Sequence, residues 1–161
     1  MPEIPFAELD YLSKALFFAH DRHRHSVTNN HRLNARHAYY AMISYLDEKL
    51  GQLLKQSEET GLRDNMVVVF TSDHGEMMVE RGMWFKQCFW EWSARVPLVI
   101  LDRRTTQATS ILLNCSLVDL LPTFVALAGG GDGPLAPTIS EMAGHSLGPL
   151  LFGETGNGAI V

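Results

Sequence analysis

Apolar residues recur at helical spacing in two segments of the N-terminal half. In residues 6–19 they return every three or four positions, which predicts a short helix: Leu9, Leu12, Leu16 and Ala19. Residues 30–60 repeat the pattern over a greater length and predict a long amphipathic helix: Leu33, Tyr40, Ile43, Leu46, Leu50, Leu53 and Leu54. Asn30 is its expected N-cap, and Gly61 is expected to end it. The polar residues 20–30 show no period and predict a loop.

Two short apolar runs predict β-strands. Residues 66–70 are rich in valine, and a run of this length is typical of a buried parallel strand. Residues 96–101 form the second run, with Pro97 near its start, where a missing N–H is tolerated. A further helix is expected over residues 116–128, capped by Ser116 and containing Pro122. This order of helix, strand, loop, strand and helix is typical of half of a doubly wound α/β sheet.

The residues that follow the first predicted strand carry the candidate chemistry. Asp73 and His74 come together at its carboxyl end, where open α/β sheets bind their ligands. Asp73 offers an oxygen donor and His74 a nitrogen donor, and Gly75 lets the backbone turn away behind them. The pattern therefore predicts a metal site at Asp73 and His74 that needs further ligands from elsewhere. The alternative is an ordinary strand-to-helix turn in which Asp73 is a cap.

Composition narrows the class of protein. The chain has 161 residues, of which 46% are hydrophobic, and this length suits one domain or most of one. A net charge of −5 gives no support to a nucleic-acid partner. Cys88 and Cys115 form no C-x-x-C motif, which favours a reducing compartment, and no apolar run approaches the ~18 residues of a membrane span. We therefore expect a cytoplasmic protein with no nucleic-acid partner and no membrane association.

Three segments of the chain resemble a known family. Residues 65–100, NMVVVFTSDHGEMMVERGMWFKQCFWEWSARVPLVI, are similar to the carboxyl-proximal core of the sulfatase branch of the alkaline phosphatase superfamily. Within them, residues 80–86 (ERGMWFK) are most similar to choline sulfatases, and residues 35–47 and 116–123 agree with the family in order and spacing. The resemblance covers roughly residues 32–151, after the helix and polar loop of residues 1–31 and before a tail at 152–161. It implies a partial alkaline-phosphatase-like doubly wound α/β sheet with flanking helices, truncated at both ends, in one partial domain over residues 1–161.

The resemblance also implies specific site chemistry. It predicts a divalent cation at Asp73 and His74, calcium foremost with manganese or magnesium as alternatives, and further ligands from an upstream segment. Lys86 matches the lysine that contacts the substrate sulfate in the family. The family's nucleophile is an upstream Cys or Ser in a C/S-x-P/A-x-R motif, converted to formylglycine, and neither Cys88 nor Cys115 lies in such a motif. We therefore expect the isolated chain to be inactive.

For the complete enzyme, the resemblance implies a sulfuric ester hydrolase acting on a small-molecule sulfate ester, choline sulfate foremost. A homo-oligomer is one possible state of that enzyme. Two other functions stay open at this point. One is part of a phosphodiester or phosphonate monoester hydrolase, since a metal held by Asp73 and His74 also suits phosphoryl transfer. The other is a non-catalytic remnant.

Several candidate residues have a structural alternative. Lys86 could be a solvated surface lysine. Asp21 with the nearby histidines His20, His23 and His25 could bind a transition metal, but a solvated polar turn is the favoured interpretation. A cluster of aromatic residues could bind a quaternary ammonium group, although core packing is favoured: Trp84, Phe85, Phe89, Trp90 and Trp92.

Overall fold

The computed structural model describes residues 4–105, 108, 110–130 and 141–152. The chain divides into two compact units. The first comprises Met1–Asn65 with Val69–Val99, and the second comprises Met66–Val68 with Ile100–Val161. Most of the predicted tail at 152–161 lies outside the described residues.

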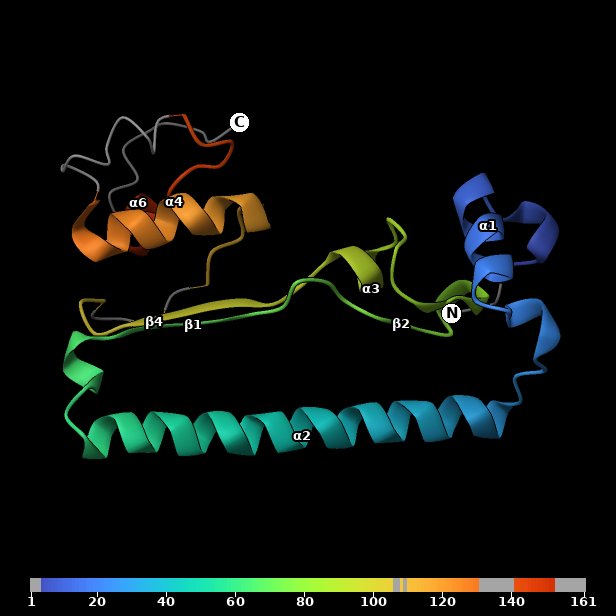
Figure 1. Ribbon diagram of the computed structural model, residues 1–161, viewed down its shortest axis with the longest axis horizontal. Coiled ribbons are helices and arrows are strands. Elements are labelled where there is room, and N and C mark those ends of the chain that lie inside the picture. Colours follow the sequence, from blue (N-terminus) through green and yellow to red (C-terminus); the bar gives the residue numbers. More distant parts are fainter. Residues whose placement is uncertain (1–3, 106–107, 109, 131–140, 153–161) are drawn as a thin grey trace. The chain divides into compact units, whose positions relative to one another are not determined.

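Helices and short strands alternate along the chain (Figure 1). The α-helices are α1 (Tyr11–Ala19), α2 (Asn29–Glu59), α3 (Glu91–Ala94), α4 (Leu120–Val125) and α6 (Gly148–Leu151). The strands are β1 (Val67–Thr71), β2 (Met77–Met78), β3 (Trp84–Phe85) and β4 (Leu98–Asp102). Short 3-10 turns lie at Phe6–Glu8, Arg22–Arg24, Arg63–Asn65, Glu80–Gly82 and Leu117–Asp119, and a π-turn at Ala126–Gly130 follows α4.

The first predicted helix is divided in two. A 3-10 turn at Phe6–Glu8 comes first, and α1 starts only at Tyr11, because the Asp10 carboxylate caps it by accepting a hydrogen bond from Ser13 N at 3.0 Å. The helical spacing of the apolar residues is therefore correct from Tyr11 onward, while Phe6–Glu8 form a separate turn and Leu9 and Asp10 connect it to α1.

The long helix α2 agrees with the predicted span within one residue at each end. Its N-cap is Thr28 rather than Asn30: Thr28 Oγ1 accepts from His31 N at 3.2 Å, and the His31 ring completes a capping box. The Thr28 hydroxyl precedes the first turn and can therefore accept from the N–H of His31. Asn30 already lies inside the helix, so its side chain cannot cap that turn. Gly61 ends the helix with φ +70°, and its N–H donates to Glu58 O at 3.0 Å.

Strands β1 and β4 form one two-stranded sheet. In Figure 1 the chain runs through β1 and β4 in opposite directions. Their side chains are mostly half-buried and not fully buried. Among the described residues no further strand extends this sheet, and the valines of β1, which alternate between its two faces, are only half-buried.

The buried core of the first unit lies beside the strands β2 and β3. These pair antiparallel, with Met77 opposite Phe85 and Met78 opposite Trp84. Met77 is fully buried and packs with Met83 and Cys88, and the partly buried residues Leu16, Trp90 and Trp92 lie against this group. The region that the sequence presents as a long loop is therefore the best-packed part of this unit.

A short polar network organises the second unit. Asp119 accepts hydrogen bonds from Ser116 N at 2.7 Å and from His145 N at 2.9 Å. Thr123, which is fully buried, donates to Asp119 O at 2.6 Å and accepts from Leu147 N at 2.8 Å. These contacts hold α4 and the segment before α6 together. The helix that the sequence predicted over 116–128 is a series of three helical segments, Leu117–Asp119, α4 and Ala126–Gly130.

These hydrogen bonds predict a pH-dependent contribution of Asp119 to stability. The N–H groups of His145 and Ser116 lower the pKa of Asp119, because both stabilise its charged form. A lowered folded-state pKa stabilises the fold above the unfolded pKa of about 3.9, and this stability is lost as pH falls through the folded pKa. Asp119→Asn should therefore lower the free energy of unfolding by about 1–2 kcal/mol at pH 7, and this difference should shrink as pH falls from the unfolded pKa toward the lowered folded pKa.

Urea unfolding of both proteins at several pH values measures this difference. Asp47→Asn removes the same charge from an exposed position on α2 and should change stability by less than about 0.5 kcal/mol. An Asp119→Asn penalty that is the same at pH 7 and pH 3 would contradict the assigned origin.

Helix α2 carries a series of exposed apolar side chains: Leu33, Tyr40, Met42, Ile43, Tyr45, Leu46 and Leu53. The amphipathic pattern that predicted the helix is thus not matched by a buried face among the described residues. No helix in the described part of the chain is both long and apolar enough to cross a membrane.

Candidate metal centre

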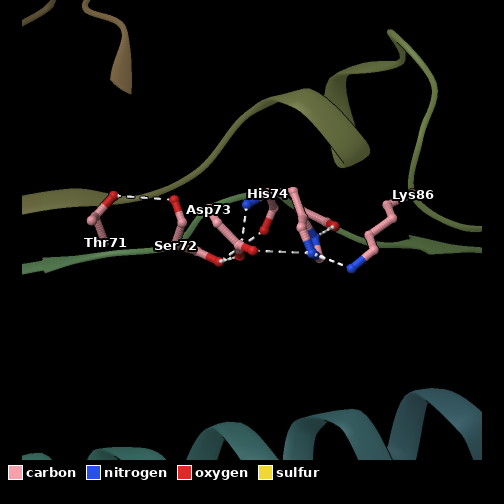
Figure 2. Close-up of polar contacts among 6 residues, drawn as sticks. Thr71, Ser72, Asp73, His74 and Lys86 are labelled. Atoms are coloured by element: carbon pink, nitrogen blue, oxygen red, sulfur yellow. Dashed lines mark hydrogen bonds and ion pairs between the residues drawn. The ribbon is translucent and has the colours of Figure 1, made fainter. Parts of the chain in front are cut away.

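Asp73 and His74 leave the end of β1 with their donor atoms close together (Figure 2). Asp73 Oδ2 lies 3.4 Å from His74 Nε2. The turn is fixed locally: His74 N donates to Asp73 Oδ1 at 3.0 Å, and Ser72 Oγ donates to His74 O at 2.8 Å. The two neighbouring side chains therefore point toward a common region and not to opposite faces of an extended strand.

Gly75 docks this turn onto the segment that precedes β4. Its N–H donates to Ser93 O at 2.8 Å. A Cβ at position 75 would lie 2.0 Å from Trp92 O and 3.0 Å from Arg95 O, so only glycine allows this close approach of two backbone segments. The glycine predicted to relieve a turn thus has a second role, because it lets helix α3 pack directly behind the candidate ligands.

Lys86 reaches the same region from β3. The register of β2 and β3 pairs Met77 with Phe85, so Lys86, the next residue, lies near the start of β2 and within reach of His74. Its Nζ lies 2.5 Å from His74 Nε2, and Figure 2 shows the ammonium beside the imidazole ring. On the other side of the ring, Nδ1 lies 2.8 Å from Gly75 O, so it carries the proton while Nε2 accepts from the ammonium.

The loop that presents Lys86 has a strained backbone. Four residues other than glycine have positive φ angles within nine positions: Val79 (79°), Arg81 (55°), Phe85 (65°) and Gln87 (74°). Two of them flank Lys86. Such conformations cost about 1–3 kcal/mol each and persist where the surrounding structure fixes them, often at functional sites. Lys86 is itself exposed, so backbone strain, and not burial, makes this loop a candidate functional segment.

The charges around Asp73 favour its ionised form. Partial desolvation raises the pKa of Asp73. His74, the backbone N–H groups of Asp73 and His74, and the Lys86 ammonium lower it by a larger amount, so the pKa of Asp73 lies below its ordinary value. The side chain is 83% exposed. A carboxylate oxygen that is charged and open to solvent is available to a cation.

The donor set and its spacing fit a divalent cation. An ion about 2.4 Å from each of two donors would see donors 3.4 Å apart at roughly a right angle, which six- or seven-coordinate sites use. Asp73 supplies a carboxylate oxygen and His74 supplies Nε2, whose lone pair now accepts from Lys86. In the part of the chain that the structure describes, no group of three or more histidine, cysteine or carboxylate side chains lies close enough to hold a metal. Two ligands alone give a weak and open site.

The structure separates the other sequence-predicted candidates. Cys88 is buried in the core beside Met77, and Cys115 is exposed and unpaired. In the loop before α2, Asp21 pairs with Arg24 at 3.3 Å and joins no metal-binding group among the described residues. Glu91, at the start of α3, forms an exposed ion pair with Arg95 at 3.1 Å.

The aromatic residues do not form one cage. Trp90 and Trp92 pack against the core, and the guanidinium of Arg81 lies 3.7 Å from the Trp90 ring centre, which covers that face with a cation. Phe89 is 91% exposed. Core packing is therefore the correct interpretation for Trp90 and Trp92, and a quaternary ammonium cannot use the Trp90 face that Arg81 occupies.

One contact that supports the site has no signal in the sequence. Arg36, on α2, donates to Glu80 Oε1 at 2.7 Å and to Met78 O at 3.1 Å, and so ties α2 to the strained loop. Glu80 also accepts from Met78 N. Arg36 and Glu80 lie 44 positions apart, and no periodicity links residues at that separation. Arg36 lies in residues 35–47 and Glu80 in residues 80–86, two segments that resemble the family, but nothing in either segment indicates that the two side chains meet.

Comparisons with a family model and with curated relatives point to the same family. The family model described as Sulfatase matches residues 5–130. The choline-sulfatase of Rhizobium meliloti (strain 1021) is 40% identical over 126 residues, covering 78% of this chain and 24% of the relative. The arylsulfatase K of Danio rerio is 37% identical over 118 residues, covering 73% and 21%. The chain thus spans about a quarter of the length of the curated relatives that it matches.

Solved structures agree with these relatives. A sulfatase of Bacteroides thetaiotaomicron, described in connection with glycosaminoglycan metabolism, superposes with a TM-score of 0.66 at 32% identity over 74% of this chain and 24% of that one. The phosphonate monoester hydrolase of Agrobacterium radiobacter gives a TM-score of 0.64 at 28% identity over 81% and 25%. The fold is therefore part of the alkaline-phosphatase-like α/β architecture, as the sequence predicted.

Proposed function

Because the chain belongs to the sulfatase family, we propose that it supplies part of the active site of a sulfuric ester hydrolase. In this proposal Asp73 and His74 hold a divalent cation, calcium foremost, and Lys86 contacts the sulfate group. The observation that supports it is the convergence of three side chains from two separate segments, with donor atoms 2.5 and 3.4 Å apart. A bound cation would act as a Lewis acid and orient the attacking oxygen.

Lys86 would act by charge and position. Its ammonium offers three donors to sulfate oxygens and would stabilise negative charge that grows on the transferring group. The Lys86 ammonium and a cation cannot both occupy the lone pair of His74 Nε2. Cation binding would therefore release the ammonium from the ring and free it for the substrate.

Choline sulfate is the substrate that we propose first, because the choline-sulfatase of Rhizobium meliloti is 40% identical to this chain. A phosphonate monoester is the second candidate, supported by the superposition with the hydrolase of Agrobacterium radiobacter at a TM-score of 0.64. The covered face of Trp90 means that recognition of a quaternary ammonium would depend on other groups.

Calorimetric titration with calcium tests the metal ligands. With two protein ligands and an exposed site, we expect a dissociation constant in the millimolar range. Asp73→Ala should abolish the binding, whereas Asp47→Ala, which removes an exposed carboxylate of α2, should not change it. Lys86→Met removes a competing positive charge and should tighten calcium binding by about fifteen-fold, which corresponds to the roughly 1.7 kcal/mol Coulomb energy between a unit charge and a divalent cation about 5 Å apart in water.

Two results would overturn this assignment. One is micromolar calcium affinity, which would require ligands beyond Asp73 and His74. The other is equal affinity of the Asp73→Ala and Asp47→Ala variants, which would show that the cation binds elsewhere.

A further inference from the structure

A cavity in the first unit has no role in the proposed metal centre. It has a volume of about 290 Å³ and lies between the end of α1, the loop before α2 and strand β3. Three aromatic side chains, Phe17, Trp84 and Phe85, line it together with three nitrogen-bearing side chains, His20, Arg22 and His25. Its volume is at the low end for ligand sites and suits one ring with a small substituent.

Two polar atoms of the residues that line this cavity lack hydrogen-bond partners in the described part of the chain. His20 Nε2 and Arg22 Nε are both buried without a hydrogen-bond partner among the described residues. Arg22 is nevertheless held in place, because one terminal nitrogen donates to His25 O at 2.6 Å and its guanidinium lies 5.7 Å from the Phe17 ring centre. Buried polar atoms in native proteins are normally paired. The unpaired N–H of Arg22, together with a His20 nitrogen that donates when it carries the proton, points to a missing acceptor at this cavity.

The sign of the local charge identifies that acceptor. No carboxylate is among the residues that line this cavity. An adjoining cavity of about 340 Å³ shares Phe17, Arg22 and Gly82 with it and adds Arg81, whose Nε is also buried without a partner in the described part of the chain. Two permanent cations with no lining anion attract a negatively charged ligand and repel a quaternary ammonium.

The walls define the rest of the ligand. The His20 and Phe85 rings lie 5.1 Å apart at a steep angle, and Phe85 remains half exposed at the cavity. Flat apolar side chains on several sides favour a flat apolar body. We propose that this cavity binds an aromatic monoanion of benzoate size, with its carboxylate against Arg22 and His20 and its ring among Phe17, Trp84 and Phe85.

This site is independent of the proposed sulfatase chemistry. It needs neither Asp73 nor a metal, and its residues lie on elements other than the Asp73–His74 turn. A failure of calcium binding at the metal centre would not affect anion binding in the cavity. A failure of anion binding in the cavity would likewise not affect the proposed metal centre.

The test uses fluorine NMR of the complete chain with 4-fluorobenzoate, read from the linewidth of the ligand signal. We expect saturable binding whose affinity is unchanged by calcium. The cationic analogue 4-fluorobenzyltrimethylammonium and the neutral 4-fluorobenzyl alcohol should bind at least ten-fold more weakly. The neutral probe also reports non-specific adsorption to the exposed apolar side chains of α2.

Variants locate the binding site. Arg22→Gln should weaken 4-fluorobenzoate binding by about ten-fold, the effect of losing a charge-assisted hydrogen bond. Arg24→Gln, a matched loss of charge two residues away in a pair with Asp21, should leave it unchanged. If circular dichroism shows that Arg22→Gln does not fold, His20→Phe keeps an aromatic ring beside Phe85 and should weaken binding by about five-fold.

The proposal is overturned if the three probes bind alike, if 4-fluorobenzoate shows no saturation, or if Arg24→Gln weakens its binding as much as Arg22→Gln. It is also overturned if both Arg22→Gln and His20→Phe fold and bind 4-fluorobenzoate as the unmodified chain does.

Discussion

Gly75→Ala is expected to lower the free energy of unfolding by about 3 kcal/mol and to eliminate calcium binding at Asp73 and His74. The added Cβ would lie 2.0 Å from Trp92 O, which is backbone and cannot rotate away as a side chain could. Either α3 or the Asp73–His74 turn must move. Movement would break the 2.8 Å hydrogen bond from Gly75 N to Ser93 O and displace the His74 ring, whose Nδ1 lies 2.8 Å from Gly75 O.

Chemical denaturation and calcium calorimetry measure the two effects together. Gly51→Ala is the matched control, since nothing lies within 4 Å of a Cβ at that position in the middle of α2. It should raise the free energy of unfolding by about 0.5–1 kcal/mol through helix propensity. Equal stabilities of the Gly75→Ala and Gly51→Ala variants would show that α3 does not pack against the turn as described.

The purified chain is expected to hydrolyse neither choline sulfate nor an aryl sulfate, whichever of calcium, manganese or magnesium is supplied. Neither cysteine lies in the family's nucleophile motif, and Cys88 is also buried in the core. The chain corresponds to 24% of the choline-sulfatase of Rhizobium meliloti, and the described residues offer only two converging metal ligands. Without a nucleophile, a positioned cation and Lys86 cannot complete a turnover.

Hydrolysis is measured as release of sulfate from choline sulfate and of 4-nitrophenol from 4-nitrophenyl sulfate, with the Asp73→Ala variant as the background. Metal-dependent turnover that is present in the unmodified chain and absent from Asp73→Ala would refute the prediction. Turnover equal in both proteins would indicate a contaminating sulfatase.

Periodicity predicted the elements well where the pattern was long. The 3.6-residue repeat over residues 30–60 matches α2, because a helix depends mainly on contacts within a few positions along the chain. The N-terminal boundaries of α1 and α2 were predicted less well. Asp10 and Thr28 cap these helices through side-chain hydrogen bonds, and other polar residues nearby could have served as caps equally well by sequence alone. The direction of β1 relative to β4 could not be predicted, because a valine-rich run has the same appearance in either orientation.

The candidate site shows the same division. Asp73 and His74 are adjacent, so their joint position after a strand was predictable from the sequence alone. The role of Gly75 was only half predicted: its turn was expected, but its contact with Ser93 was not. Lys86 was singled out by resemblance, whereas its 2.5 Å approach to His74 follows from the pairing of β2 with β3.

The sequence by itself determined the long helix α2, the strand that precedes the Asp73–His74 pair and the family to which the chain belongs, since these depend on neighbouring residues and short motifs. Only the tertiary structure decided that Lys86 meets His74, that Arg36 reaches Glu80 and that His20 and Arg22 face one aromatic cavity. These contacts join residues from separate elements, and their geometry depends on how the chain closes loops and pairs strands. No local pattern of residue types encodes that closure.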